Sequence, residues 1–494
     1  MKTTLSILLL LFIATRPASA QKTRKLAADS TITTTGEVTV KGKRFPYTVV
    51  TGTQPVWDED GKAIAALEYT YYERTDITNK ATRPLVISFN GGPGSASVWM
   101  HMAYTGPRIL EIDSEGFPIQ PYGVKENPYS ILDVADIVYV NPVNTGYSRI
   151  LIKDTPKDKF FGVNADIKYL GEWLTNWVSR KGRWTSAKYL IGESYGTTRV
   201  SGLALELQNA HWMYLNGVIL VSPTELGILR GGPVEAAVNL PYFAAAAWYH
   251  KMLPADLQAK DLTDMLPEVE EFTLTELIPG IARGGFIQEA KRKELASKMA
   301  RYSGISEKVI LQHNLDVPVD FFWKELLRDK GGYTIGRLDS RYKGIDMKEA
   351  GMSPDYSAEL SSWLHAFTPA INYYLREVLK YKTDLQYNMF GPVSPWNDDE
   401  DNTGRNLRLA MAENPYLNVM FQSGYYDGAT QYFNAKYTMW QIDPSGKMKD
   451  RFSFKGYRSG HMMYLRAEDL ATANEDIREF IIKSTPKKGQ AAKY

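Results

Sequence analysis

A serine flanked by two glycines at the end of an apolar run is the feature that most constrains how this chain folds. Residues 189–191 read Tyr-Leu-Ile and lead into Gly192, Ser194 and Gly196. The apolar run predicts a short buried strand, and the residues after Gly196 have helical character. A serine at such a bend needs a strained backbone, and the two glycines leave room for the tight turn. The stretch therefore predicts a strand–turn–helix that presents the serine hydroxyl.

The segments around this bend alternate between expected strands and expected helices. Buried strands are predicted at four further apolar runs, residues 85–89, 137–140, 218–221 and 417–422. A helix is expected from about Asn164, and an amphipathic closing helix over 468–482. Alternation of this kind predicts a mostly parallel central sheet, whereas the apolar/polar alternation within 30–75 predicts antiparallel N-terminal strands. The fold class is thus α/β, and the bend matches the nucleophile elbow of the α/β-hydrolase fold.

The expected domain boundaries lie where the alternation of strands and helices changes. Residues 1–20 have a basic start, a short apolar core and a small-x-small exit at Ala20, which is typical of a signal peptide and predicts an exported, periplasmic or secreted protein. Residues 21–224 and 386–494 are expected to form the α/β-hydrolase core. Residues 225–385 are rich in helical patches and poor in strand signals, so we expect an inserted helical cap there.

Composition removes several function classes. The 494 residues include no cysteine, which excludes a cysteine nucleophile and thiolate zinc sites. The 58 basic and 56 acidic residues give a net charge of +2, so there is no electrostatic case for binding nucleic acid. No run after the signal peptide is long enough to predict a membrane span. We expect neither a metal nor an organic cofactor.

A serine nucleophile needs a base and an acid that orients the base. A short last strand is predicted over residues 451–455, and of the six histidines His461 alone follows it, within a glycine-flanked loop. Asp427 follows the predicted strand at 417–422, and Asp443 is a rival acid in a turn-like Pro-Ser-Gly setting. The order Ser194, Asp427, His461 is the order of α/β-hydrolase triads.

The tetrahedral intermediate of acyl transfer also needs backbone donors. Residues 89–94 read Phe-Asn-Gly-Gly-Pro-Gly and follow the first central strand, where α/β-hydrolases place the oxyanion loop. The amides of Gly92 and Tyr195 are the two expected donors.

Several motifs in order give the chain a resemblance to a known family. They are Asn90-Gly-Gly-Pro-Gly-Ser-Ala-Ser97, Gly192-Glu-Ser-Tyr-Gly196, Asn127-Pro-Tyr-Ser130, Pro142-Val143 with Thr145-Gly-Tyr-Ser148, Ser423-Gly424 leading to Asp427, and Gly460-His-Met462. Together they resemble the serine carboxypeptidase family over about residues 65–225 and 385–482. The resemblance implies a serine-type exopeptidase that acts on peptides with a free C-terminus, and no cofactor. It also implies that Asn90 and Glu193 bind the substrate carboxylate. A protonated Glu193 could do so, whereas an ionised one would repel it, so an acid-shifted preference is expected.

The chain also departs from the pattern of that family. Ser95 stands where a cysteine is usual, and Tyr425 stands where an acidic residue is usual. These changes leave the triad intact but alter the surroundings of the substrate. Other functions remain open on the same fold: an aminopeptidase of the proline-iminopeptidase type, an esterase, an acyltransferase, or a catalytically silent binding protein.

Overall fold

The structure is a computed structural model that describes residues 25–228, 230–487, 489 and 491. The expected signal peptide at 1–20 lies outside the described residues. Within the described part of the chain, no helix combines the length and apolar character needed to cross a membrane.

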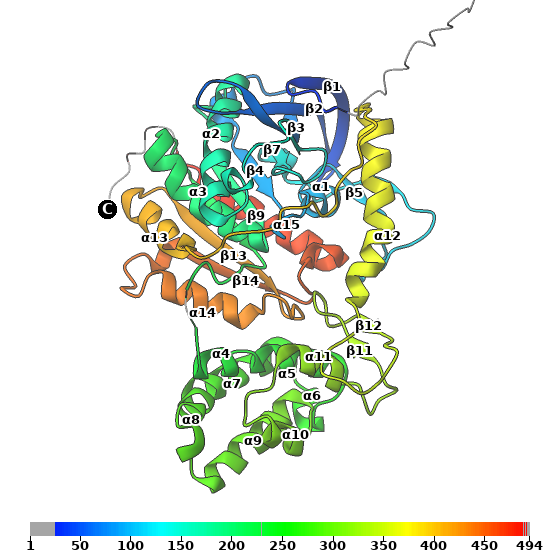
Figure 1. The fold of residues 1–494 in the computed structure, drawn as a ribbon, viewed down its shortest axis with the longest axis vertical. Helices are drawn as coiled ribbons and strands as arrows, with labels where there is room; N and C mark the ends of the chain where they lie inside the picture. The colour runs from blue at the N-terminus through cyan, green and yellow to red at the C-terminus, as the bar shows by residue number, and fades with distance from the viewer. Residues whose placement is uncertain (1–24, 229, 488, 490, 492–494) are drawn as a thin grey trace, which may run out of the picture.

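A single large twisted sheet forms the centre of the molecule (Figure 1). Its strand order is β1-β2-β3-β7-β4-β9-β10-β13-β14, and β8 pairs with β3. The pairs from β1 to β7 are antiparallel, and all pairs from β7 to β14 are parallel. The strand bounds are β1 Ser30–Val40, β2 Lys43–Trp57, β3 Ala63–Arg74, β4 Leu85–Phe89, β7 Asp136–Val140, β8 Arg149–Ile150, β9 Lys188–Glu193, β10 Gly217–Val221, β13 Asn418–Gly424 and β14 Phe452–Tyr457. The α/β-hydrolase expectation, with antiparallel N-terminal strands and a parallel centre, is confirmed.

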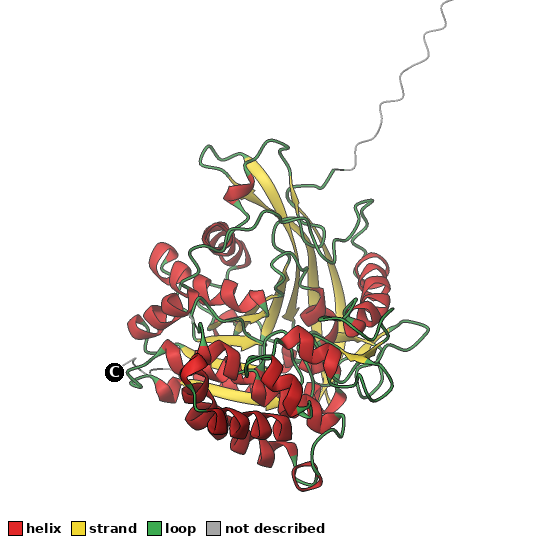
Figure 2. Cartoon of the chain, turned by 60° about the horizontal axis from the view of Figure 1, so that its bottom comes forward, coloured by secondary structure: helices red, strands yellow, loops and turns green. Residues whose placement is uncertain are grey.

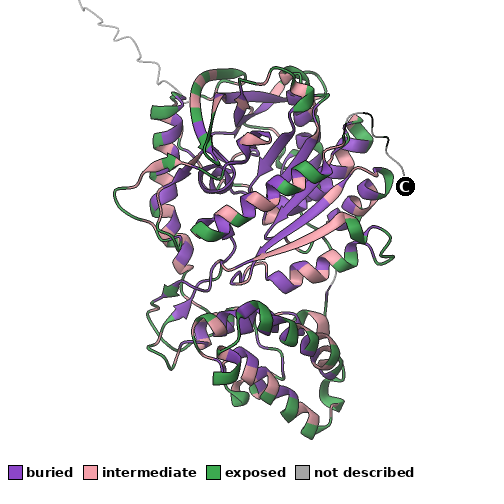
Figure 3. Ribbon diagram, turned by 180° about the vertical axis from the view of Figure 1, so that it is seen from behind, coloured by how far each residue is buried: buried purple, intermediate pink, exposed green. Residues whose placement is uncertain are grey.

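The burial of the strands explains their sequences. Every residue of β4, β7, β9 and β10 is buried, because helices cover both faces of the parallel part of the sheet (Figures 2 and 3). Strands of this kind read as continuous apolar runs. In β1, exposed residues alternate with less exposed ones, which is why its sequence alternates.

Two sets of helices bury the two faces of the sheet. One apolar cluster joins the strands to α2, α3, α13 and α14, and the other joins them to α1, α12 and α15. Their bounds are α1 Val98–Ala103, α2 Val163–Lys181, α3 Tyr195–His211, α12 Ala358–Tyr373, α13 Thr403–Glu413, α14 Tyr432–Ile442 and α15 Ala467–Ser484. The sequence did not predict α13 and α14. The residues that α14 buries include Tyr432, Phe433 and Thr438, types that favour strands as much as helices.

A helical unit with its own apolar cluster lies at the other end of the molecule (lower half of Figure 1). It contains α4 Pro233–Ala237, α5 Leu240–Tyr249, α6 Ala255–Gln258, α7 Leu262–Phe272, α8 Ile278–Ile281, α9 Glu289–Ser303, α10 Glu307–Gln312 and α11 Val319–Glu325. Two small ribbons complete the fold, β5 Arg108–Leu110 with β6 Val124–Glu126, and β11 Thr334–Ile335 with β12 Lys343–Gly344.

The helix α12 falls within the range expected for the cap but packs elsewhere. Its buried residues Trp363, Phe367 and Ile371 belong to the cluster that also contains α1 and α15. The ring centroids of Phe367 and Trp99 lie 4.6 Å apart. The division at 225 and 385 stays a prediction, and this packing favours placing α12 with the core.

Candidate active site

The carboxyl ends of β4, β9, β10, β13 and β14 lie along one edge of the sheet, because these strands are parallel. Ser194 lies between β9 and α3 with φ 57° and ψ −129°. A positive φ is costly for a residue with a side chain and persists only where the surrounding structure imposes it. Ser194 N donates to the carbonyl of Val221 on the adjacent strand (3.0 Å), and Thr197 N donates to the carbonyl of Ser194 (2.8 Å).

The two flanking glycines are needed because backbone atoms occupy the space of a side chain. A Cβ on Gly192 would lie 2.1 Å from the carbonyl oxygen of Gly196. A Cβ on Gly196 would lie 2.7 Å from the carbonyl oxygen of Phe89, at the end of β4. The bend is therefore packed against itself, as the sequence predicted, and also against the neighbouring strand β4.

Asp427 and His461 are brought together from the loops after β13 and β14. His461 Nδ1 lies 2.7 Å from Asp427 Oδ2, and both side chains are buried. Three further donors hold the carboxylate: the amides of Ala429 (2.8 Å) and Thr430 (3.0 Å) contact Oδ1, and the Thr430 hydroxyl donates to Oδ2 (2.7 Å). The rival Asp443 instead accepts hydrogen bonds from Ser445 and from the amide of Met448, which makes it a turn residue.

The environment of His461 favours its charged form. Burial acts to lower the pKa of His461, but the adjacent Asp427 carboxylate and the negative charge of Glu193 outweigh it, so the pKa is raised above its usual value. This is the electrostatic setting of a base that must hold a proton while a bond is broken.

The loop after β4 lies directly against the start of α3. A Cβ on Gly91 would lie 2.4 Å from the amide nitrogen of Tyr195 and 2.6 Å from the carbonyl oxygen of Glu193. Gly92 has φ 103°, which a larger residue adopts only with strain. Gly92 and Tyr195 line the same cavity as Ser194 and His461.

Asn90 and Glu193 form a hydrogen-bonded pair in the lining of that cavity. Asn90 Nδ2 donates to Glu193 Oε1 (2.9 Å), and the Tyr464 hydroxyl donates to Glu193 Oε2. Burial, the largest effect, raises the pKa of Glu193 to about 7, although the charge of His461 and the hydrogen bonds from Tyr464 and Asn90 act in the opposite direction. A carboxyl group with this pKa is largely neutral in mild acid.

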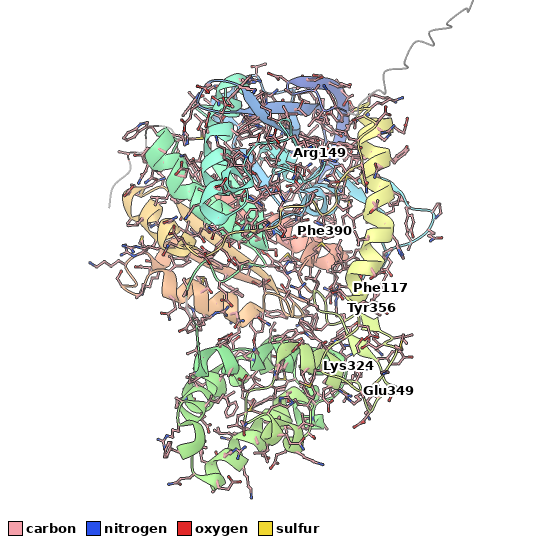
Figure 4. All side chains as sticks on the ribbon, viewed as in Figure 1. Phe117, Arg149, Lys324, Glu349, Tyr356 and Phe390 are labelled. Carbon is pink, nitrogen blue, oxygen red and sulfur yellow. The ribbon has the colours of Figure 1, made fainter. Side chains whose placement is uncertain are left out.

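A cavity of about 630 Å³ collects these groups. Asn90, Gly92, Glu193, Ser194, Tyr195 and His461 all line it. One side is apolar, formed by Trp99, Leu360, Val393 and Phe390, and Phe390 is labelled in Figure 4. The same lining includes an exposed arginine, Arg337. Among the described residues, no group of three or more histidine and acidic side chains is placed to hold a metal ion.

Sequence reasoning missed three contributors to the site. Tyr464 lies two residues beyond Met462 of the histidine motif, and its ring stacks on Tyr104 with centroids 4.5 Å apart. Thr430 lies three residues beyond Asp427, a spacing typical of a side chain that bonds back to its own turn. Arg337 is far from every motif, and no local signal pointed to it.

The strand order, the bend at Ser194 and the bonded loops after β13 and β14 show that the protein has the α/β-hydrolase fold. The serine carboxypeptidase family model matches residues 56–266 of the chain, so the resemblance predicted from the motifs is confirmed.

Two curated relatives and one solved structure illustrate the similarity. Serine carboxypeptidase-like 16 of Arabidopsis thaliana is 29% identical over 209 residues, which cover 39% of this chain and 44% of that protein. Serine carboxypeptidase-like 36 of the same plant is 33% identical over 166 residues, 32% of this chain and 31% of that protein. The chain thus spans less than half the length of these relatives. The crystal structure of the prohormone-processing carboxypeptidase Kex1 from Saccharomyces cerevisiae covers 90% of this chain and 93% of its own, with a TM-score of 0.51 and 15% identity, and shows the shared fold.

Proposed function

We propose that the protein is an exported serine carboxypeptidase that hydrolyses the last peptide bond of peptides with a free C-terminus. The observation that carries the proposal is the Asn90–Glu193 pair, which lines the same cavity as Ser194 and His461. An amide and a neutral carboxyl can both donate to a carboxylate, so the cavity has a place for the free end of a peptide next to the nucleophile.

The proposed chemistry uses the three triad residues in turn. Ser194 Oγ attacks the scissile carbonyl while His461 takes the hydroxyl proton, and His461 then gives this proton to the leaving amino acid. A water molecule, deprotonated by His461, releases the acyl group and regenerates Ser194. Asp427 keeps Nδ1 of His461 protonated and stabilises the imidazolium.

The backbone supplies the remaining stabilisation. The Gly92 and Tyr195 amides are proposed to donate to the oxyanion of each tetrahedral intermediate. The Tyr195 amide is at the first residue of the 17-residue helix α3, where the helix dipole also favours negative charge.

The state of Glu193 sets the expected pH dependence. A neutral Glu193 binds the substrate carboxylate and an ionised one repels it, so activity on peptides is expected to favour the acid side of about pH 7. Residues 225–385 are proposed to act as a cap, since Arg337 and Leu338, which lie between the helical unit and α12, line the cavity.

An aminopeptidase would need acidic groups to meet a substrate ammonium. In the described lining of the cavity, Glu193 supplies the one carboxyl group, and it is already bonded to Asn90 and Tyr464. The lining also contains the cation of Arg337, which disfavours an ammonium.

The test is a comparison of dipeptides blocked at one end. We expect hydrolysis of an N-blocked dipeptide with a free carboxylate, and little hydrolysis when the carboxylate is amidated. Cleavage of only the free-amine dipeptides would indicate an aminopeptidase, and cleavage of simple esters alone would indicate an esterase. A folded protein that a fluorophosphonate probe does not label at Ser194 would instead be a binding protein.

A further inference from the structure

A short segment from the chain between the helical unit and α12 is fixed between the acid loop and the histidine loop. We call residues 336–340 the strap. The carbonyl of Arg337 accepts from Gly428 N (3.0 Å), next to Asp427. The carbonyl of Leu338 accepts from His461 N (2.6 Å), and Ser340 N donates to the carbonyl of Tyr426 (2.9 Å). The strap thus bonds to both loops that carry the acid and the base.

A buried ion pair and close backbone packing also hold the strap in place. Asp339 pairs with Arg341 at 2.7 Å with both side chains buried, and Asp339 Oδ2 accepts from Gly460 N (3.2 Å). A Cβ on Gly460 would lie 2.4 Å from the carbonyl oxygen of Leu338, so there is no free space between the strap and the histidine loop. The backbone of Arg337 is therefore in a defined position relative to His461.

The side chain of Arg337 is exposed, whereas the strap residues on either side of it, Gly336 and Leu338, are buried and half-buried. It lines the same 630 Å³ cavity as Ser194 and His461, and it is exposed. Among the described residues that line this cavity, it is the one lysine or arginine. Its charge acts against the rise in the pKa of His461, although Asp427 and Glu193 outweigh it.

The nearest carboxyl group on α12 does not balance this charge in mild acid. Glu359 accepts a hydrogen bond from the amide of Leu338 (2.8 Å) and is buried. Burial, the largest effect, raises the pKa of Glu359 to about 7, with the charge of Arg337 acting to lower it. Below that pH Glu359 is largely neutral, and so is Glu193. Among the described residues that line the cavity, Arg337 then supplies a cation, and no carboxyl group is largely ionised.

We propose that Arg337 is a specificity-determining residue that makes this enzyme prefer peptides with an acidic side chain at one of the two residues flanking the scissile bond. The inference rests on the proposed carboxypeptidase function and adds the substrate class to it. The physical reason is that the guanidinium, held by a fixed backbone, offers a planar pair of donors to a carboxylate beside the reacting bond.

The expected size of the preference is moderate, because the side chain is exposed. Exposed ion pairs of this kind change an equilibrium by at most about fivefold, and salt screens them. We therefore expect kcat/KM for a glutamate-containing dipeptide to exceed that for its glutamine isostere by about three- to fivefold at low ionic strength.

The experiment uses N-blocked dipeptides that differ only in glutamate or glutamine, with the change placed at the last residue in one pair and at the preceding residue in the other. The full chain is compared with Arg337→Met, Arg337→Glu and the control Arg283→Met. Arg283 is an exposed arginine on the helical unit and does not line the cavity, so the control makes the same change in charge elsewhere. Fluorophosphonate labelling of Ser194 reports that each variant retains a formed site.

The wild-type protein and Arg283→Met should both prefer glutamate at one of the two positions, and added salt should weaken the preference. Arg337→Met should bring the glutamate-to-glutamine ratio to about one, and Arg337→Glu should invert it, as expected for a charge effect. A ratio that stays the same in Arg337→Met, or a wild-type ratio of one at both positions, would overturn the inference while leaving the carboxypeptidase proposal intact. Failure of the wild-type protein to cleave any of the dipeptides would overturn both.

Discussion

Replacing Glu193 with glutamine should remove the alkaline loss of activity on peptides. The substitution keeps the shape and the hydrogen bond from Asn90 Nδ2, but the side chain can no longer ionise. In the wild-type protein, burial raises the pKa of Glu193 to about 7. Above this pH the carboxylate form dominates and repels the free carboxylate of the substrate.

The magnitude follows from the titration of one group. With a pKa of about 7, the neutral fraction of Glu193 is about 99% near pH 5 and about 10% near pH 8. If only the neutral form binds the substrate carboxylate, the ionisation of Glu193 by itself lowers kcat/KM on N-blocked dipeptides about tenfold between these two pH values, and the titration of His461 adds a separate acid limb. In Glu193→Gln the fall should be absent.

The same variant should also move the acid limb of the profile. His461 must be neutral to accept the Ser194 proton, and the charge of Glu193 is one of the effects that raise its pKa. Removing that charge lowers the pKa of His461, so the acid limb should shift to lower pH. Because the two groups interact, the apparent pKa of each limb belongs to the coupled titration of Glu193 and His461 rather than to one residue.

The assay is kcat/KM over pH for an N-blocked dipeptide and for an ester of similar size that has no carboxylate. The ester should lack the alkaline loss even with the wild-type protein. Glu68→Gln is the matched control, because Glu68 is another buried glutamate with a pKa raised to about 7, and it does not line the cavity. An alkaline limb on the dipeptide that persists unchanged in Glu193→Gln would refute the role of Glu193.

Four further outcomes are expected. Ser194→Ala should abolish hydrolysis and fluorophosphonate labelling without changing the thermal unfolding midpoint by more than a few degrees, and residual turnover at the wild-type rate would exclude Ser194 as the nucleophile. Tyr464→Phe removes a hydrogen bond that lowers the pKa of Glu193, so the alkaline limb on peptides should move to higher pH; a shift to lower pH would contradict this contact. Gly192→Ala should destabilise the protein by several kcal/mol or prevent folding, since its Cβ would lie 2.1 Å from a backbone oxygen, and a normal yield with normal urea unfolding would contradict the packing of the bend. Glu68 has a folded-state pKa of about 7 against an ordinary value of 4.5, so it releases its proton more readily once the chain unfolds; its contribution to stability is greatest below about pH 4.5 and falls by up to about 3 kcal/mol as the pH rises through about 7, and urea unfolding of Glu68→Gln should lack this loss.

The sequence alone determined the parts of the protein that depend on local pattern. Strand β4 was predicted at its observed bounds, and β7, β9, β10, β13 and β14 to within one or two residues, because buried parallel strands leave continuous apolar runs. The bend at Ser194 was predictable for a similar reason. Backbone atoms a few residues away or on the adjacent strand leave no room for a side chain at its two glycines. Such contacts therefore require glycine, and the requirement can be read from the sequence.

The candidate site residues were named from motif order, and the structure brings Ser194, His461, Asn90, Glu193, Gly92 and Tyr195 around one cavity, with Asp427 bonded to His461. The experiments above test the roles proposed for these residues. Residues such as Tyr464 and Thr430 carried no distinctive signal, because tyrosine and threonine are common in positions without any function.

Only the tertiary structure decided the features that depend on residues far apart in the chain. The pKa of Glu193 arises from burial and from partners 103 and 271 residues away, and no local pattern encodes such an environment. The position of α12 also depends on long-range contacts. Its apolar face could pack on the helical unit or on the core, and in the structure it packs on the core. Arg337 reaches the cavity because the strap bonds to the loops of Asp427 and His461, and those backbone bonds place no constraint on side-chain type. Local sequence therefore specified the strands and the bend that carry the candidate site, whereas long-range packing set the pKa of Glu193 and placed the charge of Arg337 at the cavity.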